Sequence, residues 1–255
     1  MGTMAKLATT TKALRHLRLV QPPEFPSSDP EWDMPESVRH GRLCELLYQI
    51  LINTLGPEHS VGEDNFVYYD KAHAKRCLAP DGFVKLEFPN DVFDTWQTWE
   101  RGVPELCVEI LSPSDTEEKL TFRTKLSRYH ALGTKELIAF NIDAPVGSRL
   151  RAWDRVRGKL VPRRVTNETT PCRTLGLHWV IASGGGLIPI ALRLAKDPEG
   201  REILPTAHEV DRAGREVERK AKELERAAKD TEHAARLKAE AEVARLRKLL
   251  AKRKR

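Results

Sequence analysis

The order of apolar and polar positions predicts both helices and strands in the first part of the chain. From Pro35 to Leu55, apolar side chains recur at helical spacing, which predicts a helix. Short β-like runs follow at 65–69 and 82–88, each bounded by polar residues, glycine or proline. The segment 106–111 (LCVEIL) is apolar apart from one acid, as expected for a central strand that is covered on both faces.

The segment 105–143 has the pattern of a strand, a helix and a second strand. The residues SPSD at 112–115 are typical of a helix N-terminus, and the predicted helix continues to Gly133. An apolar run at 137–142 predicts a parallel strand reached by a right-handed crossover. A hairpin is predicted over 149–165. We therefore expect an α/β domain with a mixed sheet flanked by helices.

Composition divides the chain into three predicted parts. Residues 1–34 form a leader expected to be flexible, because prolines gather at its end. Residues 35–205 form the α/β domain. Residues 206–255 are rich in Ala, Glu, Lys, Arg and Leu, which predicts a long helix. Apolar residues in this helix keep a seven-residue spacing over two short stretches, Val210, Val217 and Leu224, then Val243, Leu246 and Leu250. This spacing is compatible with a coiled-coil homodimer. The alternatives are a helix that packs on the domain and a helix that stays solvated.

The net charge of +6 lies in the tail. Residues 209–255 hold 16 Lys or Arg and 10 Asp or Glu, whereas residues 1–208 hold 27 of each sign. The last stretch, 245–255, has seven basic residues and no acid. It is expected to be a solvated helix end or to add salt-sensitive affinity for DNA phosphates.

Cysteine spacing and hydropathy exclude several classes of protein. The four cysteines form no C-x-x-C pair, and Cys44 and Cys107 fall in apolar segments, so neither a zinc site nor a disulfide framework is expected. The N-terminus has no apolar core typical of a secretory signal, and the longest apolar stretch, 179–194, is interrupted by glycines and a proline. We expect a soluble cytoplasmic protein with no membrane segment. No Walker or G-x-G-x-x-G motif indicates an organic cofactor.

Three polar residues stand out from the pattern that builds the fold. Asp81 lies at the start of a β-run, where the alternative is an ordinary turn acid. Glu109 lies inside the most apolar strand, so it should meet a cation, either a metal or a salt-bridge partner. Lys125 lies at the edge of the apolar stripe of the following helix, from which it could also extend to water.

Two acids and a lysine suit metal-assisted hydrolysis of phosphodiesters. Carboxylate oxygens are ligands for Mg²⁺ (or Mn²⁺), which also binds substrate phosphate. The ion acidifies a water and neutralises charge at phosphorus, while an ammonium group stabilises the attacking hydroxide. No Ser, Cys or His arrangement offers a better nucleophile.

The chain also resembles a known family. The order Pro80-Asp81, EILSPS at 109–114, KLSRYHALGTKEL at 125–137 and Asp143 is similar to the Uma-type family of proposed restriction endonucleases, within the PD-(D/E)XK nuclease superfamily. The resemblance covers about 33–205. It implies a restriction-endonuclease-like fold and a DNA substrate.

The resemblance assigns roles by position. It implies that Asp81, Glu109 and the carbonyl of Ile110 bind the metal and that Lys125 is the catalytic lysine. The usual superfamily lysine lies two residues after the glutamate, where this chain has Leu111, and an acid common four residues before Lys125 is replaced by Thr121.

The first helix offers further candidates. His40 matches a histidine common in the family, and Glu36 is the favoured glutamate near the metal, because both share a face with Leu43 and Leu47, whereas Glu45 points away. The alternatives are a first-turn acid that complements the helix dipole and a hydrogen-bonded core histidine.

Two functions compete on these grounds. The first is a divalent-metal-dependent DNA endonuclease. The second is a non-catalytic protein of nuclease fold that binds nucleic acid or a protein partner and assembles through its helical tail. The losses at positions 111 and 121 favour the second, and the retained Asp81, Glu109 and Lys125 favour the first.

Overall fold

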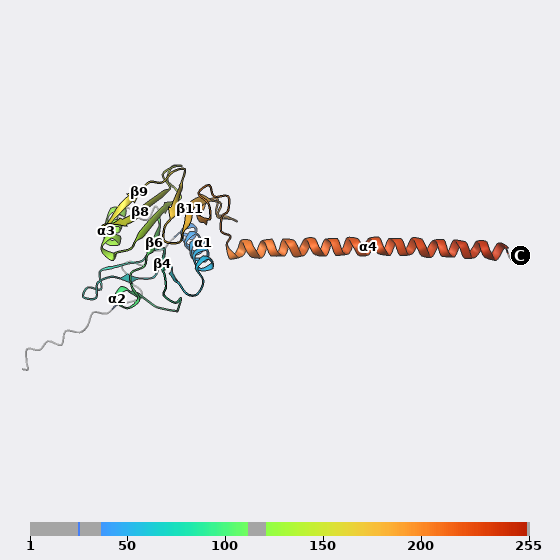
Figure 1. Ribbon diagram of the computed structural model, residues 1–255, viewed down its shortest axis with the longest axis horizontal. Coiled ribbons are helices and arrows are strands. Elements are labelled where there is room, and N and C mark those ends of the chain that lie inside the picture. The colour runs from blue at the N-terminus through green and yellow to red at the C-terminus, as the bar shows by residue number, and fades with distance from the viewer. Residues whose placement is uncertain (1–24, 26–36, 112–120, 254–255) are drawn as a thin grey trace, which may run out of the picture. The chain divides into compact units, whose positions relative to one another are not determined.

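The computed structural model describes residue 25 and residues 37–111 and 121–253. The chain divides into two compact units, one ending at Leu204 and one beginning at Pro205. The first unit is built on β-sheets with helices, and the second is one long helix (Figure 1).

A six-stranded mixed sheet forms the centre of the first unit. Its strand order is β1-β4-β6-β7-β8-β9. The strands are β1 Ser60–Gly62, β4 Gly82–Lys85, β6 Leu106–Leu111, β7 Glu136–Asn141, β8 Leu150–Val156 and β9 Lys159–Arg163. Only β6 and β7 run parallel in this sheet, and the short β1 and the polar β9 form its two edges.

Both strands of the predicted strand-helix-strand segment around Glu109 are confirmed. β6 has the bounds expected from the LCVEIL pattern, and all six of its residues are buried. β7 pairs with it in parallel, with Glu109 beside Ala139. The expected hairpin is also present, since β8 and β9 are joined by Arg157 and Gly158, both with positive φ as a two-residue hairpin turn requires.

Two small sheets are also present in the described part of the first unit. One contains β10 Thr169–Cys172, β11 Leu177–Ala182 and β12 Ala191–Ala195, all antiparallel. The other contains β3 Cys77–Leu78, β2 Val67–Tyr68 and β5 Trp96–Gln97. Strands of two or three residues are too short for a period-two pattern, so no hydrophobic pattern predicts β1, β3 or β5.

The described residues of the first unit form three helices: α1 Val38–Leu55, α2 Thr98–Arg101 and α3 Phe122–Leu132. α1 confirms the helix predicted from Pro35, and Ser37 caps it. The prediction of one helix from 112–115 to Gly133 is wrong at Thr121. The backbone of Thr121 is extended (φ −58°, ψ 148°), and its side chain accepts the amide of Thr124 as an N-cap. The SPSD segment lies outside the described residues.

The central sheet separates two hydrophobic cores. On one face, α1 and the β10–β12 sheet pack against Val108, Ile110 and other side chains of the central strands. On the opposite face, α3 and the β2–β3–β5 sheet pack against Phe83 and Cys107. In Figure 1, α1 and α3 accordingly lie on opposite sides of β4 and β6. The alternation along β6 sends Glu109 to the α3 face, together with Cys107.

The second unit is α4, Ala207–Arg253, which confirms the long helix expected from the tail composition. Ion pairs between residues three or four apart run along it, such as Lys222 with Glu218 and Lys229 with Glu225. Each such pair stabilises a helix by only about 0.3–0.5 kcal/mol, but together they support a solvated helix. In the described ranges of the chain, no helix is both long enough and apolar enough to cross a membrane.

Candidate active site

Asp81 lies where β4 begins, directly beside the buried acid of β6. Gly82 is the first residue of β4 and pairs with Val108, so extending the register by one residue places Asp81 across from Glu109. Asp81 is 8% exposed, and its Oδ2 accepts a hydrogen bond from the Ile110 amide at 2.5 Å. Because β4 has no residue left to pair with Ile110, the side chain of Asp81 provides the acceptor that the ladder lacks.

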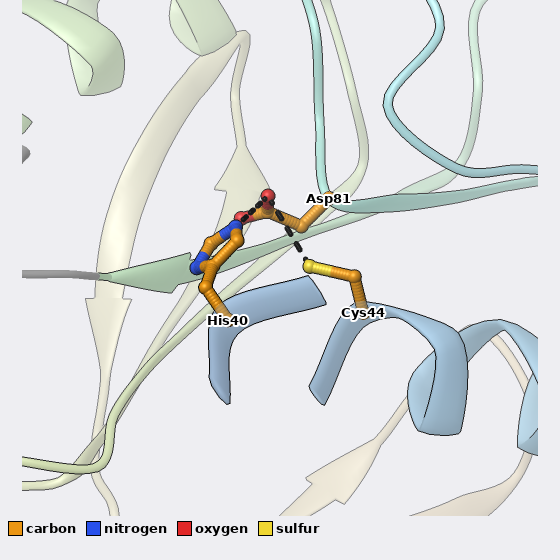
Figure 2. A group of neighbouring side chains, drawn as sticks. All are labelled: His40, Cys44 and Asp81. Carbon is orange, nitrogen blue, oxygen red and sulfur yellow. Dashed lines mark hydrogen bonds and ion pairs between the residues drawn. The ribbon is translucent and has the colours of Figure 1, made fainter. Parts of the chain in front are cut away.

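A close approach of α1 brings two more polar groups to Asp81. A Cβ atom on Gly82 would lie 2.8 Å from Cδ2 of the buried Leu47, so glycine allows this tight packing of helix and strand. His40 and Cys44 are one turn apart on α1 and both face the strand. His40 Nε2 lies 3.0 Å and Cys44 Sγ 3.7 Å from Asp81 Oδ1 (Figure 2).

Glu109 is held by two groups of α3. This residue is 1% exposed. Lys125 Nζ donates to Oε2 at 2.7 Å, and the Tyr129 hydroxyl donates to Oε1. Lys125 and Tyr129 are four residues apart and therefore share one face of α3. The lysine side chain keeps 19% of its surface exposed, so the ammonium lies at the boundary between this buried acid and solvent.

Burial sets the protonation of Glu109. The pKa of this carboxyl is raised from 4.5 to about 7: burial raises it most, the charge of Lys125 opposes that rise, and the nearby charge of Asp81 adds to it. The pKa of Tyr129 is also raised, chiefly by burial and next by the charge of Glu109. Two neighbouring buried carboxylates thus repel each other, and a cation placed between them would relieve both the repulsion and the cost of burial.

Replacing Glu109 with glutamine should alter how protein stability depends on pH. Because the folded pKa lies above the unfolded one, the native state favours the protonated form, and stability is lost as pH rises from about 4.5 to 7. At 1.36 kcal/mol per pKa unit, the loss is up to roughly 3 kcal/mol. Glu109→Gln has no such loss. In chelator, its melting temperature should therefore rise relative to wild type between pH 5 and pH 8.

The exposed Glu45 of α1 provides a matched control for this measurement. Glu45→Gln removes a carboxylate that is solvated in the folded chain, and it should show no such trend. A constant difference between Glu109→Gln and wild type across this pH range would contradict the effect of burial on Glu109.

The structure brings most of the residues predicted from sequence together. Asp81 contacts His40 and the amide of Ile110, and Lys125 contacts Glu109. In a strand the N–H and C=O of one residue point to the same side, so the Ile110 carbonyl also faces the Asp81 side of β6. Glu36 lies outside the described residues. The roles of these six residues as ligands or catalysts stay predictions.

Two groups at the site were not singled out from the sequence. The apolar segment around Cys44 predicts a small hydrophobe, and the sequence assigns no role in the site to Tyr129. Their helical spacing from polar partners was the available signal, since Cys44 follows His40 by four residues and Tyr129 follows Lys125 by four.

The family model Uma2, described as "Putative restriction endonuclease", matches residues 31–183. The chain belongs to the Uma2 family. A comparison with curated proteins finds no match. Among solved structures, a "putative nuclease belonging to DUF820" from Anabaena variabilis is similar at 12% identity, with a TM-score of 0.41, over 56% of this chain and 76% of that chain.

The matched region of this Uma2 family chain contains all the contacts described above, from His40 to Tyr129. It ends before β12 and does not include α4. The family match therefore indicates a nuclease in the first unit and says nothing of the long helix.

Proposed function

We propose that the chain is a divalent-metal-dependent DNA endonuclease that hydrolyses phosphodiester bonds. The proposal depends chiefly on one observation: the carboxylates of Asp81 and Glu109 are buried next to each other, and the ammonium group of Lys125 donates a hydrogen bond to Glu109. Membership of the Uma2 family supports a nuclease. The finer assignment to DNA and to a divalent metal is our own.

The donor set suits Mg²⁺ or Mn²⁺. These ions prefer oxygen ligands and bind through one or two carboxylates together with substrate phosphate. Asp81, Glu109 and the carbonyl of Ile110 would hold the ion. Its chemistry there would be to acidify a water and to neutralise charge on the phosphate.

The remaining residues have distinct tasks in this proposal. His40 and the Ile110 amide fix the orientation of the Asp81 carboxylate, each by a hydrogen bond. Tyr129 fixes Glu109 in the same way. Lys125 places a partly solvated positive charge next to Glu109, where it can stabilise a hydroxide as it attacks. The lysine is thus supplied by α3 rather than by β6, where Leu111 is directed into the α3-side core.

Plasmid DNA and purified full-length chain provide the test. We expect nicking that requires Mg²⁺ or Mn²⁺, that stops in chelator, and that is lost in Asp81→Asn, a variant of nearly the same shape. Equal nicking by wild type and Asp81→Asn would remove the assigned site. A folded wild-type chain that binds DNA but cuts no substrate with either metal would favour the non-catalytic alternative.

We also propose that α4 joins two copies of the chain. Val210, Val217 and Leu224 keep a seven-residue spacing and are 56%, 69% and 73% exposed. Such residues would be buried in a coiled coil. Light scattering should give a dimer for the full chain and a monomer for a chain ending at Pro205. Equal oligomeric states would contradict this. The basic end at 245–255 as a DNA contact, and a cytoplasmic location, stay predictions.

A further inference from the structure

Three buried groups with different ligand atoms meet at the α1 side of Asp81. They are the His40 ring, the Cys44 thiol and the Asp81 carboxylate, which belong to residues that are only 7%, 4% and 8% exposed. One ligand atom from each lies within 4.8 Å of the others (Figure 2). The Mg²⁺ assignment does not use Cys44, and it uses His40 only to orient Asp81.

The chemistry of this set differs from that of the carboxylate pair. Mg²⁺ binds oxygen almost exclusively and has little affinity for sulfur. A thiolate, an imidazole and a carboxylate together are typical ligands of Zn²⁺ and of its spectroscopic substitute Co²⁺. Burial favours such a site further, because a dication balances the charges of one thiolate and one carboxylate.

The geometry is close to that of a tetrahedral ion. Ligand atoms that lie 2.0–2.3 Å from zinc are separated by about 3.5 Å from one another. His40 Nε2 and Asp81 Oδ1 are 3.0 Å apart, and Cys44 Sγ and the same oxygen 3.7 Å. Two of the three ligands lie one turn apart on a single helix, which fixes their spacing. Three protein ligands leave a fourth position open.

We propose that His40, Cys44 and Asp81 form a binding site for a thiophilic divalent cation of the Zn²⁺ class, adjoining the carboxylate pair. The ion binds the sulfur of Cys44, and the thiol proton leaves to solvent. Asp81 belongs to both sites, with Oδ1 directed to His40 and Cys44 and Oδ2 to the amide of Ile110. The proposal concerns binding and holds whether or not the chain cuts DNA.

Cobalt titration of the full-length chain, freed of metal and kept reduced, tests the proposal. We expect a near-ultraviolet charge-transfer absorption from thiolate to Co²⁺ that saturates at one ion per chain and disappears when Zn²⁺ displaces the cobalt. Absence of this band in folded wild-type protein would overturn the proposal, because it would leave Cys44 as a hydrogen-bonded core thiol.

Matched variants locate the site. Cys44→Ala should abolish the band, and His40→Ala should weaken Zn²⁺ binding more than about tenfold. Cys107→Ala removes a buried thiol on the opposite face of the sheet and should keep the band. A band that persists in Cys44→Ala, or that is lost in folded Cys107→Ala, would also overturn the proposal.

Glu109→Gln separates this site from the proposed nuclease centre. Glu109 contacts Lys125 and Tyr129 on α3 and is not one of the three ligands. The variant should therefore keep the thiolate band and its Zn²⁺ affinity within a few-fold, even if it no longer binds Mn²⁺. Loss of the band in folded Glu109→Gln would contradict a separate site at Cys44.

Discussion

Replacing Glu109 with glutamine is expected to reduce metal-dependent cleavage of plasmid DNA by about 10²–10³-fold, the cost of removing one preorganised charge-stabilising group. The variant has nearly the shape of wild type and can still accept the Tyr129 hydroxyl. It lacks the charge that attracts a divalent cation. Lys125, partly exposed already, can turn its ammonium to water. We therefore expect a folded chain that cuts poorly, measured as the initial rate of nicking in Mn²⁺.

Glu105 provides the control for this variant. It lies just before β6, is 8% exposed and forms ion pairs with Lys85 and Lys135, away from the candidate site. Glu105→Gln should cut within a few-fold of wild type as long as its melting curve shows a folded chain. Glu109→Gln that is folded and cuts at the wild-type rate would show that the acid of β6 is structural.

Replacing Lys125 with methionine should lower kcat by about 10²–10³-fold while changing the affinity for Mn²⁺ less than about tenfold. Methionine retains the unbranched stem but not the charge, and both carboxylates that would hold the ion remain. Because the charge of Lys125 lowers the pKa of Glu109, the variant raises that pKa further, and the assay is best run at alkaline pH, where the acid stays ionised. Single-turnover cleavage at saturating DNA measures the effect.

Two other substitutions identify the cause. Lys125→Arg keeps the charge and should recover part of the rate. Lys135→Met removes a lysine that is 73% exposed and lies 3.7 Å from Glu105, and it should leave cleavage unchanged. If Lys125→Met lost metal affinity and kcat in equal measure, or lost neither, a role for the ammonium in the chemical step would be contradicted.

The sequence predicted those parts of the site that depend on local patterns. Glu109 stands out as the one acid in an otherwise apolar run, because a buried strand tolerates an ionisable group only where that group has a partner. Helical spacing placed Lys125 near the sheet, and the structure pairs it with Glu109. The tail helix followed from composition alone. Periodicity needs only neighbours in the chain, so these features could be predicted without knowledge of the fold.

Features that depend on long-range packing could not be predicted. The contact between Cys44 and Asp81 joins residues 37 positions apart and requires the close approach at Gly82. The break at Thr121 arises because its side chain bonds the Thr124 amide, and nothing in the apolar stripe distinguishes that cap from a helical threonine. The strands β3 and β5 hold two residues each and exist only through pairing with β2.

The margins of the central sheet limit how two copies could meet. β1 is only three residues long. β9 contains the charged residues Lys159 and Arg163 and also Pro162, which has no amide hydrogen to donate. Short, charged or proline-bearing outer strands are poor templates for adding a strand from another molecule. The central sheet is therefore protected from edge-to-edge pairing with another molecule and from the aggregation that such pairing starts. Two copies could still associate through the side chains of a helix.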